Sequence, residues 1–162
     1  MAFDPNPYAA LAEARPPSAE ADAVPEIWNP TAAANWSLIF TPVFGAYLQM
    51  RNWHAMGEPD RALNSKAWFV GSIVTYALIF ILGVLARAEA SQGLSRTTGF
   101  VLLLAWYFAS GKKQMDYVKQ RFGTGYNRRP WGKPLLLGVV AIVAIVAVDA
   151  AFLLASGADL DQ

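Results

Sequence analysis

The sequence predicts an all-α membrane protein, a small helical bundle of three full transmembrane helices plus one hydrophobic segment broken by proline. Charged residues make up 15% of the chain, against about 25% in ordinary soluble domains. Several uncharged runs approach the roughly 20 residues that a helix needs to cross a bilayer. Lysines and arginines gather in the segments between those runs. At 162 residues, the chain has room for one domain.

Residues 1–26 differ in composition from the rest of the chain. They hold five acids, one base and five prolines, with few large apolar residues. Such a segment buries too little apolar surface to offset the entropy cost of ordering it, so we expect a disordered acidic tail. Residues 27–158 then form a single transmembrane domain, and residues 159–162 form an acidic tip.

The first hydrophobic segment covers residues 27–56 and carries no charge over its first 24 residues. We predict that Thr41, Pro42 and Gly45 break it. A threonine followed by proline is typical of a helix start. A proline within a helix also removes one backbone hydrogen bond and clashes with the preceding turn.

Two half-helices are therefore expected, over residues 30–40 and 42–56, with Asn29-Pro30 starting the first and Gly57 ending the second. The segment either kinks and crosses the bilayer or forms a re-entrant hairpin that leaves on the side it entered. We favour the hairpin, because 15 residues in the second half reach only about 22 Å into a hydrocarbon core about 30 Å thick.

Three full spans are predicted, over residues 67–87, 96–113 and 134–156. The first contains an uncharged run of 20 residues, with Trp68 at its entrance as an interfacial anchor. A polar turn at residues 88–95 makes the second span an antiparallel neighbour, and Ser95 is expected to cap it. The last span has small residues at spacings of three and four, which favours close helix packing or, alternatively, a homodimer or other membrane-protein partner.

A basic segment follows the second span. Residues 112–123 combine bases with a narrow apolar stripe, which predicts an amphipathic juxtamembrane helix. Near a membrane surface, each base contributes about 1 kcal/mol of attraction to anionic lipid. The alternative is that these bases only fix the orientation. The predicted contacts with anionic head groups are Lys112, Lys113, Lys119, Arg121, Arg128, Arg129, Lys133 and Trp131.

The positive-inside rule sets the orientation of the chain. Loops 51–66 and 111–133 carry three and seven bases, whereas the C-terminal tail carries none. We therefore expect both loops in the cytoplasm of a bacterial inner membrane and the C-terminus in the periplasm. A hairpin at residues 27–56 keeps the N-terminal tail in the cytoplasm as well.

Asp149 is the one ionisable residue well inside an apolar run. A carboxylate within a membrane is by default a candidate for ion or proton handling. Asp149 is near the outer end of its span, at the level expected for Arg87 and Arg96. A structural charge latch with either arginine is therefore the favoured interpretation.

Nothing in the sequence indicates an enzyme or a cofactor. The chain has no cysteine and a single histidine, so we expect no metal site with the usual three or four such ligands. It also lacks a nucleophile–base pair, a phosphate-binding loop and a dinucleotide fingerprint. Nucleic acid is not an expected partner, because lipid accounts for a basic loop at a membrane surface.

Two blocks of residues form a pattern shared with other proteins. The first contains Trp28-Asn29-Pro30, Trp36-Ser37-Leu38, Phe40-Thr41-Pro42, Phe44-Gly45-Ala46 and Asn52-Trp53; the second contains Trp106-Tyr107, Gly111, Gln114, Tyr117-Val118, Phe122-Gly123, Tyr126, Trp131 and Pro134-Leu135. Together they resemble small bacterial inner-membrane proteins of unknown function. Some of those proteins have a small cytoplasmic domain in place of the tail, which implies a cytoplasmic N-terminus and therefore the hairpin.

Three functions are compatible with the sequence. The favoured one is a non-enzymatic accessory, scaffold or assembly subunit with a lipid-facing basic loop. The second is a small ion or proton channel or transporter that uses the broken segment and Asp149, since discontinuous helices place backbone groups where ions bind. The third is an immunity-type protein against a membrane-targeting toxin.

Overall fold

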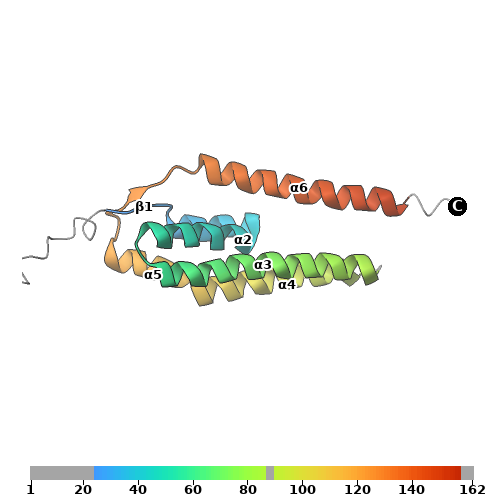
Figure 1. The fold of residues 1–162 in the computed structure, drawn as a ribbon, viewed down its shortest axis with the longest axis horizontal. Helices are drawn as coiled ribbons and strands as arrows, with labels where there is room; N and C mark the ends of the chain where they lie inside the picture. The colour runs from blue at the N-terminus through green and yellow to red at the C-terminus, as the bar shows by residue number, and fades with distance from the viewer. Residues whose placement is uncertain (1–23, 87–89, 158–162) are drawn as a thin grey trace, which may run out of the picture.

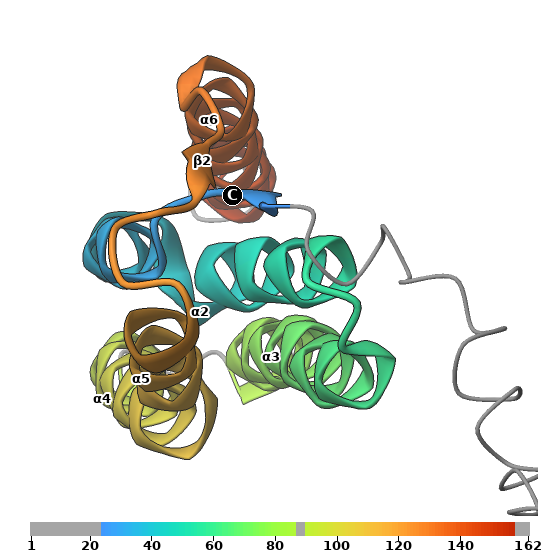
Figure 2. The same cartoon turned by 90° about the vertical axis from the view of Figure 1, so that its left-hand side faces the viewer.

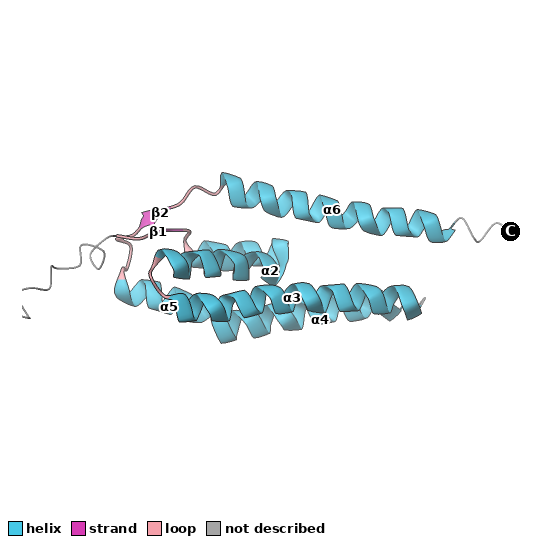
Figure 3. Cartoon of the chain, viewed as in Figure 1, coloured by secondary structure: helices cyan, strands magenta, loops and turns pink. Residues whose placement is uncertain are grey.

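The computed structural model describes residues 24–86 and 90–157. The chain is mostly helical, as the sequence predicts (Figure 3). Residues 1–23 and 158–162, and with them most of the predicted tail and the acidic tip, lie outside the described residues. In order, the elements are β1 (Glu26–Ile27), α2 (Pro30–Ala55), α3 (Pro59–Ala86), α4 (Ala90–Trp106), the π-helical turn η1 (Tyr107–Gly111), α5 (Lys112–Arg121), β2 (Asn127–Arg128) and α6 (Gly132–Gly157).

Helix α2 is a hairpin of two half-helices. The Asn29 side chain caps the first half by accepting hydrogen bonds from the backbone N–H groups of Thr31 and Ala32. The backbone leaves helical geometry at Thr41 (φ 72°, ψ 165°), immediately before Pro42. The second half then runs back beside the first (Figure 1), so the chain returns to the end where α2 began. Gly57, with φ 73°, ends this half before α3 begins at Pro59.

Two helical stretches among the described residues are long and apolar enough to cross a membrane, Pro59–Val84 in α3 and Gly132–Phe152 in α6. Their mean hydropathies are 2.1 and 2.7, and only 6% of the most apolar part of each is buried inside the protein. An apolar core helix of a soluble protein would be mostly buried, so a lipid environment accounts better for these exposed surfaces. The span predicted at residues 96–113 corresponds to α4 and η1, and α4 has 17 residues.

Several predicted boundaries are wrong. Helix α4 begins at Ala90, so most of the predicted turn at residues 88–95 is helical and Ser95 lies inside the helix instead of capping it. The predicted basic helix continues directly from α4 through η1 and ends at Arg121, before Gly123 with φ 57°. Polar residues such as serine and glutamine are tolerated within a helix, so the polar composition of residues 90–95 was not enough to predict a turn there.

The boundary between tail and domain also differs from the prediction. Strand β1 contains Glu26, and β1 pairs in parallel with β2. The N–H of Asn127 donates to the Pro25 carbonyl at 3.1 Å, and that of Arg129 donates to the Ile27 carbonyl at 3.0 Å. The last residues assigned to the tail are therefore fixed to the segment before α6.

The hairpin is the middle layer of the molecule. Seen end-on, α6 lies on one side of it, and α3 with the α4–α5 helix lies on the other (Figure 2). Buried Ala34, Ala46 and Trp106 join the hairpin to the second side. Buried Ala33, Phe44 and Leu48 face the start of α6. The core is therefore built around α2.

Candidate functional site

Gln49, in the second half of α2, is the centre of a buried polar network. Its side chain is 3% exposed. The Oε1 atom accepts hydrogen bonds from Trp106 Nε1 and from Ser110 Oγ, both at 3.1 Å, and Nε2 donates to the Ser110 carbonyl at 2.7 Å. A buried amide without partners is costly, so these bonds fix the hairpin against α4 and η1.

The π-helical turn η1 supplies part of this network. A π-turn replaces i→i+4 bonds with i→i+5 bonds and widens the helix. The N–H of Lys112 accordingly donates to the Tyr107 carbonyl. Ser110, the serine bonded to Gln49, is in this turn and is buried. Such turns are frequent at functional sites, and this one joins α4 to the basic helix α5.

Asn52 ties the two ends of the hairpin together. Its Oδ1 accepts from the Trp28 N–H at 3.0 Å, while Nδ2 donates to the Trp28 carbonyl at 2.8 Å. Gln114 of α5 extends the network, because its Oε1 accepts from Asn52 at 3.3 Å and its Nε2 donates to the Gln49 carbonyl at 2.9 Å. The start and the end of α2 therefore lie side by side.

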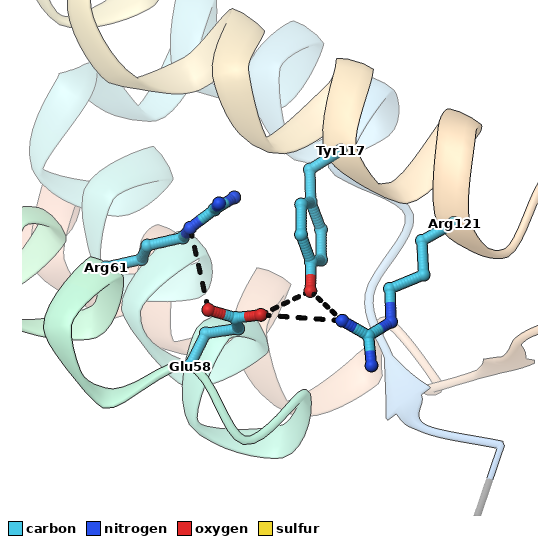
Figure 4. A network of polar contacts seen from close by, with 4 residues as sticks. All are labelled: Glu58, Arg61, Tyr117 and Arg121. Carbon is cyan, nitrogen blue, oxygen red and sulfur yellow. Dashed lines mark hydrogen bonds and ion pairs between the residues drawn. The ribbon is translucent and has the colours of Figure 1, made fainter. Parts of the chain in front are cut away.

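A charged cluster joins the α2–α3 junction to α5 through Glu58, Arg61, Tyr117 and Arg121 (Figure 4). Glu58, just before α3, accepts a short hydrogen bond from the Tyr117 hydroxyl. Arg121 Nη1 lies 3.6 Å from Glu58 Oε1 and donates to the Tyr117 hydroxyl at 2.7 Å. Arg61 Nε lies 3.5 Å from Glu58 Oε2, and its guanidinium carbon lies 4.4 Å from the centre of the Tyr117 ring. The cluster fixes the start of α3 to α5.

The pKa of Tyr117 is raised above its ordinary value of 10.0. Desolvation is the largest cause, and the hydrogen bond and negative charge of Glu58 also favour the neutral phenol. The nearby charge of Arg121 opposes this shift. Tyr117 therefore stays a neutral phenol at neutral pH and donates a hydrogen bond to Glu58.

The predicted lipid-contact bases fall into two groups. Arg121 is bound to Glu58, while Arg129 pairs with Glu26 at 4.0 Å and lies 5.0 Å from the centre of the Trp28 ring. The other group is exposed and makes no ion pair among the described residues; it consists of Lys112, Lys113, Lys119, Arg128 and Lys133. Trp131, also predicted to contact lipid, is half-buried and packs against the cluster of Ala33, Phe44 and Leu48.

Thr41, Pro42 and Gly45 lie at and near the tip of the hairpin. Thr41 and Pro42 line a cavity of about 230 Å³, together with residues of α3 and α4. Gly45 is buried, and a β-carbon there would overlap Ser37 Oγ and the Trp106 ring. The tip is therefore part of the packed structure, although it contains no charged residue.

Asp149 is exposed on α6 and does not line the cavity at the hairpin tip. Arg87 and the side chain of Arg96 lie outside the described part of the structure. The charge latch therefore stays a prediction. The described part of the chain contains no group of three or more histidine, cysteine or carboxylate residues arranged to hold a metal ion.

Sequence reasoning missed the principal contacts of this site. The sequence assigned no role to Gln49, Ser110 or Glu58, while Gln114 and Tyr117 entered only as parts of the shared pattern. The signal that could have found them is an amide side chain such as Gln49 within an apolar run, because a buried amide needs hydrogen-bond partners from other helices. Comparison with protein-family models, with curated proteins and with solved structures gives no match.

Proposed function

We propose that the chain is a non-enzymatic multi-pass protein of the bacterial inner membrane, an accessory or scaffold subunit whose basic end binds anionic lipid head groups. The observation that supports this most is the hairpin. Because α2 turns back, β1, the α2–α3 junction, α5 and the start of α6 gather at one end (Figure 1). The bases of loops 51–66 and 111–133 belong to these elements and to the segments that join them. The apolar surfaces of α3 and α6 extend away from that end.

In this proposal, the molecule has three full spans, formed by α3, α4 with η1, and α6, together with the re-entrant α2. The basic end lies in the cytoplasm with the N-terminal tail, and the C-terminus lies in the periplasm. The five exposed bases that form no ion pair within the described part of the chain contact lipid phosphates, whereas Arg121 and Arg129 pair with Glu58 and Glu26. Attraction of about 1 kcal/mol per base makes five such residues a strong anionic-lipid site.

The test uses the full-length protein in nanodiscs that contain spin-labelled phosphatidylglycerol or phosphatidylcholine. We expect preferential immobilisation of phosphatidylglycerol, which weakens as salt rises because exposed charges are screened. Replacement of Lys112, Lys113, Lys119, Arg128 and Lys133 by glutamine should abolish the preference. In the matched control, arginine replaces each lysine and lysine replaces Arg128, which should preserve it. Equal immobilisation of both lipids by the wild-type protein would reduce the bases to topology signals.

A transport function is the second candidate, favoured by the cavity beside the break at Thr41. Its lining contains no carboxylate or base, which argues against an ion-coupling site at that point. Ion or proton flux in liposomes that contain only this protein would replace the scaffold proposal. The immunity-type function has no contact in the structure that favours it.

A further inference from the structure

Strand β1 attaches the chain that precedes it to the basic end of the molecule (Figure 1). In the parallel pair of β1 and β2, Ile27 lies opposite Arg128. The backbone pairing begins at Pro25, whose carbonyl accepts a hydrogen bond from the N–H of Asn127. The chain before Val24 is therefore attached beside β2, and not at the far ends of the apolar helices.

Exposed bases lie close to this attachment point. Val118 of α5, which is next to Lys119 in the chain, is in the same buried cluster as Ile27. Lys112 is six residues before Val118, which is about 9 Å along the helix. Arg128 lies in β2 itself. The bases assigned to lipid binding therefore surround the point at which the preceding chain joins the fold.

The charges of the two segments are complementary. From Lys112 to Lys133, the chain carries seven bases and one acid, Asp116. Two of these bases pair with Glu58 and Glu26, which leaves an excess of positive charge. Residues 1–23 have the opposite balance, with one base, Arg15, and four acids, which are Asp4, Glu13, Glu20 and Asp22.

Glu26 shows that an acid next to this segment already engages the basic end, because it pairs with Arg129 at 4.0 Å. An extended chain covers at most about 3.6 Å per residue. Asp22 is four residues before Glu26, so it stays within about 14 Å of that carboxylate's backbone. Glu13 can reach about 47 Å from Glu26, whereas the 10 residues of α5 cover only about 15 Å. The length of chain is therefore sufficient to bring the acids to the exposed bases.

From this placement, we propose that the acidic segment of residues 1–23 docks on the exposed bases of the same chain and competes there with anionic lipid. Exposed ion pairs are individually weak and are screened by salt, so no single pair fixes the segment. Attachment through β1 raises the local concentration of the acids to the order of millimolar. A dense layer of lipid phosphates therefore displaces them. The competition rests on lipid binding in the proposed function, but the docking does not.

Docking is tested by coupling carboxylates directly to lysine amines with a carbodiimide, in the full-length protein in phosphatidylcholine nanodiscs. Mass spectrometry of the monomer should find links from Glu20 or Asp22 to Lys119 or Lys133. About tenfold fewer links are expected at about 1 M salt, where the screening length falls to about 3 Å. Asp159 is the internal control and should form no such link, because the 26 residues of α6, about 39 Å, separate it from the basic end.

Absence of these links would overturn the docking. Links whose yield does not fall with salt would also overturn it, because they would reflect the attachment at β1 alone and no attraction between the charges.

Competition is measured with the same spin-labelled lipids that test the proposed function. In a neutralised variant, all four acids become amides: Asp4→Asn, Glu13→Gln, Glu20→Gln and Asp22→Asn. We expect its preference for phosphatidylglycerol at low salt to be about threefold that of the wild type, and the difference to vanish at high salt. In the matched control, aspartate and glutamate are exchanged at the same four positions, which keeps every charge and should keep the wild-type preference.

The outcomes separate this proposal from the proposed function. Equal preference in the wild type and the neutralised variant would overturn the competition. A raised preference in the exchange control would show that the segment acts through its sequence and not its charge, against the proposal. No preference in either protein, with the salt-sensitive links to Lys119 still present, would contradict lipid binding and with it the competition, while the docking would be confirmed.

Discussion

The α2 hairpin and helix α6 are both apolar, yet they are held in the molecule by different means. The hairpin is fixed by buried side-chain hydrogen bonds from Gln49 and Asn52 to α4, η1 and α5. Helix α6 contacts the hairpin near its start, where Gly138 lies against Phe40, and meets α3 near its end through one aromatic pair. Most of its other side chains are exposed.

The difference shows which region is held in place by contacts within the described chain. Apolar packing between helices provides little net driving force in lipid, because the tails are as apolar as the side chains. Polar contacts therefore hold the hairpin in place, whereas α6 is held mainly near its start, where Gly138 lies against Phe40. Perturbing each region in turn should produce effects of different size.

Gln49→Leu should have the largest effect. The change leaves Trp106 Nε1 without its acceptor and the Ser110 carbonyl without the Gln49 donor, while Ser110 Oγ keeps only a 3.5 Å contact with Asn64; a buried group that loses its partner costs roughly 1–3 kcal/mol. We expect a loss of about 3 kcal/mol in the free energy of unfolding, measured by denaturant titration in detergent micelles. Val143→Ala on exposed α6 is the control and should change this energy by less than about 0.5 kcal/mol. Equal losses of unfolding free energy in Gln49→Leu and Val143→Ala would contradict the view that the hairpin and α6 are held by different means.

Gly45→Ala should come next. Its β-carbon would overlap Ser37 Oγ and the Trp106 ring, so the half-helices must separate at a cost of about 2 kcal/mol. Gly71→Ala in α3 is the matched control, since a β-carbon there meets nothing within 4 Å and alanine favours a helix by up to about 1 kcal/mol. A lower melting temperature for both variants, or for neither, would contradict the close packing of the hairpin.

Phe152→Ala should affect the position of α6 more than stability. The Phe80–Phe152 rings lie 6.2 Å apart, and such a pair contributes about 1 kcal/mol. Spin labels near the ends of α3 and α6 should report a broader distance distribution, with folding retained. Leu154→Ala, at a side chain 78% exposed, should leave the distribution unchanged. An unchanged distribution in Phe152→Ala would mean that other contacts fix α6.

The smallest effect is expected from pH. The raised pKa of Tyr117 means that its contribution to stability is complete below the unfolded-state value of 10.0 and is lost as pH rises through the higher folded-state pKa. Unfolding followed from about pH 8 to about pH 12 should show this loss in the wild type and a weaker dependence on pH in Tyr117→Phe. Identical slopes would show that Tyr117 does not couple the cluster to folding.

Local sequence signals predicted local structure well. Asn29-Pro30 starts α2, Thr41-Pro42 marks its interruption, and Gly57 adopts a left-handed conformation at its end. Each depends on the backbone preferences of one or two residues, which a single sequence contains. The two candidate spans follow equally from apolar runs of sufficient length.

Contacts between distant residues were beyond the sequence. Gln49 and Ser110 are 61 positions apart, and Glu58 and Tyr117 are 59 apart, so only helix packing brings them together. The π-turn at residues 107–111 begins with Tyr107 and Phe108, and no glycine or proline at its start marks a change in the helix. The sequence could not show which bases form ion pairs, because Arg121 and Lys119 look alike until Glu58 is placed.

The hairpin is the central claim, and the sidedness of two introduced cysteines tests it most directly. Val24→Cys precedes the hairpin and Thr124→Cys follows α5, and both positions are exposed. Intact cells treated with an impermeant thiol reagent should leave both unlabelled until the membrane is opened, while a cysteine appended after Gln162 is labelled at once. Labelling of Val24→Cys in intact cells, with Thr124→Cys still protected, would show that α2 crosses the membrane and would contradict the hairpin.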